Sequence, residues 1–493
     1  MNNTKNGGIL PLMALAAMTL LAFAPQRTQA ELVMEPKHIG AYVDFGQALT
    51  DDDKQALNRT GVYLTVAGTH DERLMVTATL GGLFWYGFPE LPSSSRLIKF
   101  GPGVGQAQAI YSFGEDPSNP TAKLQFGLFP VKYNSDATNL GEYLYRSGTY
   151  PGYVWNGGWS YINSASHLLQ GARLTIPTFG GKVTHDITLH MERDVAQPLH
   201  DFSPGYMITA KPNGFVEVGA GFVWSNAISF KPSRLAPKKL NNAYSKSTGL
   251  PVNGLTDFQI SACSSTDTLI NRNCYQDIKA GMPDTAAARA TLNAWNDCQN
   301  NGNCSDIDYY TFRGIKTMAR VSLDFGSLLA SPMLRPGDLK VYSEVALLGV
   351  ENQPFYYEDP LERLPVMVGL NVPTLGLLDR LAVEFEYRKS RFKNTFLYPY
   401  DNQGGLPVPL AVGGESPYGY ADQVVEANED MFTRDDVKWS VYATRKVTKG
   451  ITLTAQVASD NFRPANGEAK PSSQPFAKGP GEWYYVVRAG FGF

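Results

Sequence analysis

Hydrophobic and polar residues alternate along much of this chain with a period of two. Counting back from Phe493, every second residue of the last stretch is apolar or aromatic, whereas Gly492, Gly490 and Arg488 occupy positions between them. Side chains along a β-strand point alternately to opposite faces, so the stretch predicts a strand with one apolar face. Aromatic residues stand at both ends of that face, as they do in strands that cross a bilayer, although an ordinary sheet strand gives the same alternation.

Similar segments recur along the chain and predict a protein built almost entirely of β-strands. We expect sixteen strands, at residues 38–48, 62–67, 74–80, 106–113, 123–128, 168–176, 186–192, 205–211, 216–225, 316–325, 340–347, 366–372, 381–388, 437–444, 451–457 and 483–493. The segment at 205–211 fits the pattern poorly, and residues 98–104 and the interiors of the long loops are ambiguous, so fourteen or eighteen strands remain open.

The connections between these segments separate a membrane barrel from a soluble sandwich or propeller. Short connections, such as 70–73 and 447–450, alternate with connections that are longer or rich in aromatic residues, such as 87–104 and 391–436. Transmembrane barrels have short periplasmic turns and longer outer loops. The apolar faces also carry almost no charge, and a charge at mid-bilayer costs about 2–4 kcal/mol. The predicted fold is therefore all-β, a transmembrane antiparallel β-barrel of about sixteen strands with short periplasmic turns and long extracellular loops.

Composition agrees with this class and excludes others. The net charge is −3, which gives no reason to expect nucleic acid as a partner. Charged residues make up 18% of the chain, below the roughly 25% of ordinary globular domains. After residue 30 no apolar run is long enough for a helix to span a bilayer.

The C-terminal strand carries a resemblance to a known class of proteins. A strand that ends in a terminal Phe resembles the last strand of Gram-negative outer-membrane β-barrels, where that Phe belongs to the signal read by the barrel-assembly machinery. On this strand and the architecture, the chain resembles Gram-negative outer-membrane porins, with no particular porin family assigned. The resemblance implies an assembly signal at Phe493, Phe491 and Tyr485, and location in the outer membrane with both termini periplasmic. It also implies outer-membrane lipid and lipopolysaccharide as surroundings, and a possible homotrimer.

Residues 1–30 predict a cleaved secretory signal peptide. Lys5 precedes an apolar core at 9–24, and Thr28-Gln29-Ala30 offers small residues for cleavage after Ala30. An uncleaved anchor is the alternative, but the apolar run is about 16 residues and a spanning helix needs about 20. The barrel would then occupy residues 31–493.

A barrel of sixteen strands is wide enough to leave an aqueous channel. The polar faces of the predicted strands carry charges that we expect to line this channel, although each one alone fits an ion pair that braces the wall. The lining candidates are Asp186, Glu192, Glu217, Glu344, Glu384, Arg388, Lys438 and Arg488.

The third outer connection, residues 133–166, is expected to fold inward, because so many aromatic residues need a surface to pack on. In porins of this size the third outer loop commonly narrows the channel. We expect a constriction formed by Glu142 and Arg146 opposite the wall residues Arg173, Lys316 and Arg320. The alternative is an outer loop that packs on neighbouring loops or on a sister subunit.

Residues 229–312 contain all four cysteines: Cys263, Cys274, Cys298 and Cys304. In an exported chain this predicts an extracellular loop with two disulfides, of which neighbour pairing is the simplest of three connectivities. A zinc site fits less well, because the interval has no His and lacks the usual spacing. Residues 283–295 begin with Pro and Asp, are rich in Ala and predict a short helix.

No motif of a hydrolase, nucleotide-binding enzyme or zinc protease is present, so we expect no enzyme activity, no catalytic residue, no metal and no cofactor. The function predicted is passive diffusion of small hydrophilic solutes through an outer-membrane channel. Two alternatives remain: a substrate-specific channel for sugars or hydrophobic compounds, and a non-conducting surface adhesin or receptor. Mixed charges in the lumen leave the ion selectivity undecided.

Overall fold

The sixteen predicted segments all form strands of one sheet. The computed structural model describes residues 35–49, 54–86, 98–146, 167–191, 201–229, 243–248, 285–309, 314–329, 333–350, 360–389, 436–459 and 483–492. The first nine wall strands are β1 (Glu35–Leu49), β2 (Lys54–His70), β3 (Leu74–Tyr86), β4 (Ile98–Phe113), β5 (Ala122–Val131), β6 (His167–Thr178), β7 (Val183–Met191), β8 (Asp201–Ala210) and β9 (Val216–Ser225). The other seven are β13 (Gly314–Asp324), β14 (Lys340–Leu348), β15 (Val366–Asn371), β16 (Arg380–Arg388), β17 (Asp436–Thr448), β18 (Ile451–Ala458) and β19 (Trp483–Gly492).

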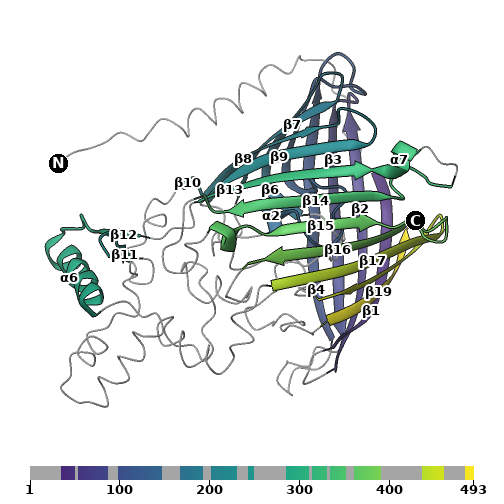
Figure 1. The fold of residues 1–493 in the computed structure, drawn as a ribbon. Helices are drawn as coiled ribbons and strands as arrows, with labels where there is room; N and C mark the ends of the chain where they lie inside the picture. Colours follow the sequence, from purple (N-terminus) through teal and green to yellow (C-terminus); the bar gives the residue numbers. More distant parts are fainter. Residues whose placement is uncertain are drawn as a thin grey trace.

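The sheet closes on itself, and every neighbouring pair in the wall is antiparallel (Figure 1). β9 pairs directly with β13, and the last strand pairs with the first from Gly40↔Gly492 to Leu49↔Trp483. A two-residue strand, β10 (Ile228–Ser229), adds to the edge of β8 and is the seventeenth member of the sheet. The predicted closed barrel and its sixteen wall strands are confirmed, and a closed barrel leaves no strand edge unpaired in a bilayer.

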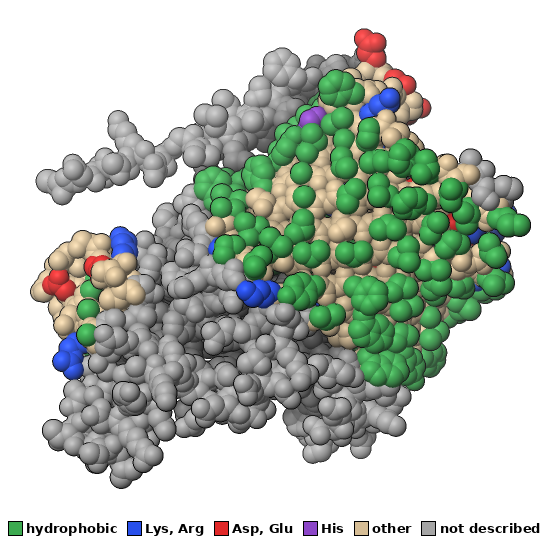
Figure 2. Space-filling view, viewed as in Figure 1, with side chains coloured by type: hydrophobic (Ala, Val, Ile, Leu, Met, Phe, Trp, Pro, Cys, Tyr) green, Lys and Arg blue, Asp and Glu red, His purple; other side chains and the backbone are tan. Residues whose placement is uncertain are grey.

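The outside of the barrel is apolar, as a lipid-facing wall must be. On β1, Ile39 and Phe45 are 50% and 60% exposed, whereas Asp44 between them is buried inside. Figure 2 shows hydrophobic side chains over the visible wall, with charged ones gathered near its two ends. Exposed apolar side chains come from most of the strands, among them Val62, Leu80, Val104, Phe126, Ile187, Val218, Phe222, Val321, Val368, Phe385, Val437 and Val487. Among the described residues, no helix is long and apolar enough to cross a membrane.

One end of the barrel carries the tight connections. These are residues 71–73, 114–121, 179–182, 211–215, 325–339, 372–379 and 449–450, and the fifth contains α7 (Phe325–Leu329). The C-terminus lies at this end (Figure 1), where the N–H of Gly492 donates to the carbonyl of Gly450. We call it the turn end. The connections at the other end fall mostly outside the described residues; one of them ends in the short helix η3 (Pro360–Arg363).

Several strands are longer than the alternation predicted. β2 begins at Lys54, eight residues before the predicted strand at 62–67, so the first long connection is only residues 50–53. β4 begins at Ile98 and includes residues expected in a loop. Polar residues stand at successive positions near the start of β2, such as Lys54, Gln55, Asn58 and Arg59, so no alternation marks that extension, whereas Gly101, Pro102 and Gly103 interrupt the start of β4.

The long connection between β9 and β13 holds a small separate unit. It contains a helix, α6 (Thr285–Asn301), and two short strands, β11 (Ala243–Ser245) and β12 (Ile307–Tyr309), which pair with each other and not with the barrel. The helix expected at 283–295 is present and continues six residues further. Cys298 and Cys304 form a disulfide, as the simplest pairing predicted. Cys263, Cys274 and the predicted signal peptide lie outside the described residues.

Reduction of the Cys298–Cys304 disulfide is expected to loosen this unit and to leave the barrel intact. The two cysteines pack with Ile307, Ala294 and Trp295, in a cluster separate from the barrel. A disulfide that closes so short a loop stabilises the folded unit by on the order of 2 kcal/mol. Limited proteolysis should therefore cut within 285–309 faster after reduction, while the melting temperature of the barrel stays constant. A fall in that temperature would show that the unit and the barrel unfold together.

Candidate functional site

A segment of the chain after β5 folds into the barrel. β5 has ten residues and its neighbour β4 has sixteen, and their pairing stops at Ala107↔Leu128. After Val131 the chain leaves the wall and runs inside the barrel to the one-turn helix α2 (Tyr143–Arg146). We call residues 132–146 the inward segment. Of the thirteen residues from 133 to 145, all but Ser135 are buried.

Glu384 of β16 is the centre of the first contact between the wall and the inward segment. Its Oε1 accepts hydrogen bonds from the N–H and the hydroxyl of Thr138 at 2.5 and 2.6 Å. Its Oε2 accepts from the N–H groups of Asn139 and Leu140 at 2.8 and 2.9 Å. Three successive backbone N–H groups thus converge on one carboxylate, an arrangement suited to an anion. The Tyr342 hydroxyl donates a fifth hydrogen bond, at 2.9 Å.

Glu344 of β14 anchors the two ends of the segment together. Its Oε1 accepts from the Tyr133 hydroxyl at 2.6 Å and from the N–H of Tyr143 at 2.9 Å. Its Oε2 accepts from the amide of Asn134 at 2.9 Å. Glu344 and Glu384 are both fully buried, so hydrogen bonds replace the water that their charges have lost.

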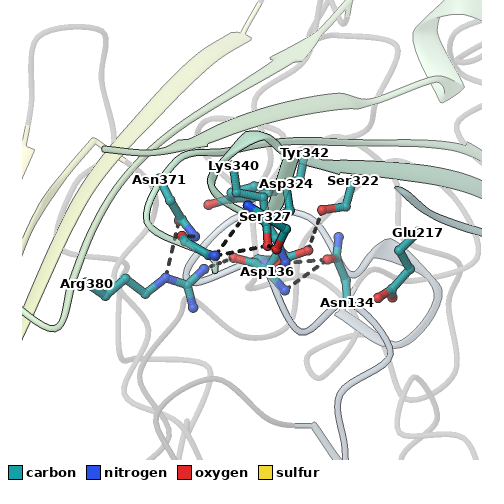
Figure 3. A network of polar contacts seen from close by, with 12 residues as sticks. Asn134, Asp136, Glu217, Ser322, Asp324, Ser327, Lys340, Tyr342, Asn371 and Arg380 are labelled. Carbon is teal, nitrogen blue, oxygen red and sulfur yellow. Dashed lines mark hydrogen bonds and ion pairs between the residues drawn. The ribbon is translucent and has the colours of Figure 1, made fainter. Parts of the chain in front are cut away.

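Asp136 of the inward segment lies among polar side chains of the wall (Figure 3). The carboxylate of Asp136 accepts from the hydroxyl of Ser322 at 2.7 Å and from Nζ of Lys340 at 2.9 Å. Its backbone carbonyl accepts from the guanidinium of Arg380, which also contacts Asn371. Lys340 and Arg380 are the first residues of β14 and β16, which start at the turn end.

Apolar contacts hold the segment as well. Leu140, Tyr143 and Leu144 are buried in a cluster with inward-facing wall residues. The wall contributes Phe129, Val131, Leu169, Met207, Val223, Met318, Tyr342, Ala346, Leu348 and Met367. Burying one such side chain is worth about 1.5–3 kcal/mol. The segment therefore covers apolar side chains of the wall as well as the carboxylates that bind it.

A reversal of the backbone precedes α2. Gly141 and Glu142 both have positive φ, at +78° and +57°. The positive φ of Gly141 favours glycine, and a Cβ there would also displace the terminal methyl of Met367, 2.6 Å away. The turn directs Tyr143 back to Glu344.

The residues expected to form a constriction have these positions. Glu142 is buried, with Oε1 accepting from the N–H of Asn134 at 3.2 Å and Oε2 3.9 Å from Nζ of Lys132. Arg146 ends α2, and its side chain lies outside the described part of the chain. Lys316 is buried on β13.

Arg173 and Arg320 are each paired with a carboxylate on the neighbouring strand. Arg173 donates to Asp186 at 2.8 Å, and Arg320 donates to Glu217 at 2.6 Å. That these five residues set the narrowest point of the channel stays a prediction.

The lining candidates with described side chains all project inward. Lys438 is buried 3.8 Å from Glu386, and Arg488 forms a bidentate pair with Asp44 at 2.6 and 2.9 Å. The side chain of Arg388 and all of Glu192 lie outside the described residues.

Sequence reasoning missed the polar run Asn134-Ser135-Asp136 and its role. The run follows directly on β5, and two of its side chains bind wall residues more than 180 positions away. A polar run between two aromatic stretches was the available signal. It did not identify the wall residues to which the run binds.

No family model and no curated protein matches the chain. Several solved structures are similar in fold. One is a triple mutant of the porin of Rhodopseudomonas blastica, at 9% identity and a TM-score of 0.41, with 94% of this chain and 100% of that chain covered. Another is OmpF of Salmonella typhi in complex with daunomycin, at 11% identity and a TM-score of 0.41, with the same coverage. The barrel described above rests on the strand pairing of this chain itself.

Proposed function

We propose that the protein is an outer-membrane channel for the passive diffusion of small hydrophilic solutes. The observation that carries the proposal is a closed barrel of sixteen strands with an apolar outside and a polar inside, only part of which is covered by the inward segment. A barrel of this strand number leaves an aqueous channel, whereas eight strands fill with side chains. Barrels of this kind usually conduct rather than catalyse.

In this proposal the turn end faces the periplasm and the long connections face outward. The arrangement follows from the short periplasmic turns of outer-membrane barrels. The terminal Phe then acts during assembly, lipid and lipopolysaccharide surround the apolar wall, and a homotrimer is possible. Residues 133–166 narrow the channel through Glu142 and Arg146.

Reconstitution in a planar lipid bilayer tests the proposal. Stepwise ionic currents in potassium chloride are expected, because water fills a lumen of this width. Current that a particular solute blocks would favour a substrate-specific channel. A silent bilayer, from protein that migrates as a folded barrel on an unheated gel, would favour the adhesin or receptor alternative and contradict the proposal.

A further inference from the structure

The wall formed by β2, β3, β4 and β5 carries a continuous row of uncharged polar side chains. The Thr65 and Thr79 hydroxyls lie 2.8 Å apart, and Nε2 of Gln106 donates to Thr79 at 3.0 Å. Nε2 of Gln108 donates to Oε1 of Gln106 at 3.1 Å, and Nε2 of Gln125 donates to Oε1 of Gln108 at 2.5 Å. We call these five residues the amide ladder.

The amide ladder faces the lumen. The residues next to it in sequence, Leu64, Leu80 and Phe126, are 39%, 57% and 51% exposed on the lipid side. Alternation therefore places the ladder residues inside. The three glutamines are half-buried, so part of each side chain remains accessible from the lumen.

Charge is distributed unequally between the two sides of the lumen. On β2 to β5, Lys123 near the turn end is the only charged residue among the inward positions whose side chains are described. On β13, β14 and β16 the inward positions include Lys316, Arg320, Asp324, Lys340, Glu344, Glu384 and Glu386. The inward segment binds Glu344, Glu384 and Glu386 of this charged side. The neutral ladder has no such cover among the described residues.

The ladder retains hydrogen-bonding capacity for a solute. Each glutamine amide has two N–H donors and one carbonyl acceptor. Gln106 and Gln108 each use one donor and the acceptor within the ladder, and Gln125 uses one donor. One N–H of each amide and the carbonyl of Gln125 remain. A solute hydroxyl both donates and accepts, so it can replace its hydrogen bonds to water with hydrogen bonds to the ladder at little cost in free energy. Apart from Lys123 and the Arg173–Asp186 pair next to Gln125, an ion finds no charge beside the ladder to compensate for lost water.

We propose that the amide ladder is the surface along which solutes pass, and that it favours neutral, hydroxyl-rich molecules such as small sugars and polyols over ions of similar size. This inference rests on the proposed channel function. In this inference the wall opposite the charged side selects the solute, rather than the predicted constriction residues.

The double substitution Gln106→Leu with Gln108→Leu tests the ladder. Leucine keeps most of the volume and removes the amide groups. Liposomes that contain the protein should take up glucose about three- to tenfold more slowly, as expected for one or two lost hydrogen bonds, while the conductance in potassium chloride changes little. Gln170→Leu is the matched control, because Gln170 is exposed on the outer face of β6. It should change neither quantity.

A second variant, Gln108→Glu, keeps the shape and adds a charge. The reversal potential in a potassium chloride gradient should shift toward cation selectivity, because the carboxylate would stand in the solute path. An unshifted potential, or equal loss of glucose uptake and conductance in the double variant, overturns the ladder proposal. Wild-type protein that is folded but passes neither ions nor glucose overturns the channel function itself, so the two failures are distinguishable.

Discussion

Glu384→Gln is expected to release the inward segment from the wall. The carboxylate accepts five hydrogen bonds, three of them from successive backbone N–H groups. A glutamine amide keeps one acceptor and turns a donor toward the N–H groups. Hydrogen bonds to a charged group are each worth about 1.5–3 kcal/mol, so the loss of two of them weakens the docking of the segment by about 3–6 kcal/mol.

Single-channel recording and limited proteolysis measure this release. We expect larger and noisier current steps and new cleavage within residues 132–146. Glu217→Gln is the control, since Glu217 is also an inward carboxylate but pairs with Lys211 of a tight turn and Arg320 of β13. If Glu384→Gln leaves current and cleavage as in the wild type, the segment is held by its apolar contacts alone.

Asp44→Ala is expected to destabilise the closure of the barrel. Asp44 on β1 and Arg488 on β19 form a bidentate pair across the junction of the first and last strands, and Asp44 is fully buried. The guanidinium also lies 4.1 Å from the centre of the Tyr42 ring. Removing one partner of a buried pair costs about 3–5 kcal/mol, because the other charge is left without compensation.

Urea unfolding of the barrel in lipid vesicles, followed by tryptophan fluorescence, measures this cost. Glu35→Gln is the matched control on the same strand, since Glu35 pairs with Lys37 at 3.4 Å where both side chains are exposed. Exposed pairs contribute at most about 1 kcal/mol. The exchange Asp44→Arg with Arg488→Asp should recover part of the loss. An Asp44→Ala barrel as stable as the wild type would show that water in the lumen already screens Arg488.

The barrel could be predicted from the sequence because the alternation that specifies each strand is local. A strand such as β13 has to alternate wherever one face meets lipid and the other meets the lumen, and the order of short and long connections then fixes the direction of each strand. The strand starts at Lys54 and Ile98 were also missed for local reasons, because polar residues stand at successive positions after Lys54, and Gly101, Pro102 and Gly103 are typical of a turn. Closure between β1 and β19 also followed from the fold, because a bilayer tolerates no open edge.

The role of the inward segment could be predicted only in part. Aromatic residues after β5 indicated that the chain turns inward. The specific anchors could not be inferred, because Glu384 binds backbone N–H groups about 245 positions away. Every residue except proline has such a group, so the sequence does not identify the donors. Likewise, nothing in the sequence distinguishes Glu384, which holds the segment, from Glu217, which pairs with a neighbouring arginine. That difference depends on where the segment leaves the wall.

The unequal lengths of the wall strands give the barrel an oblique rim. β2 and β3 pair from His70↔Leu74 up to Asn58↔Tyr86, whereas β14 and β15 pair only from Lys340↔Asn371 to Val345↔Val366. A strand rises about 3.3 Å per residue, so the wall at β2 and β3 extends roughly 20 Å further along the strands. The high side of the rim stands above the amide ladder and the low side above the inward segment. The described strands therefore form the taller wall on the neutral side of the lumen.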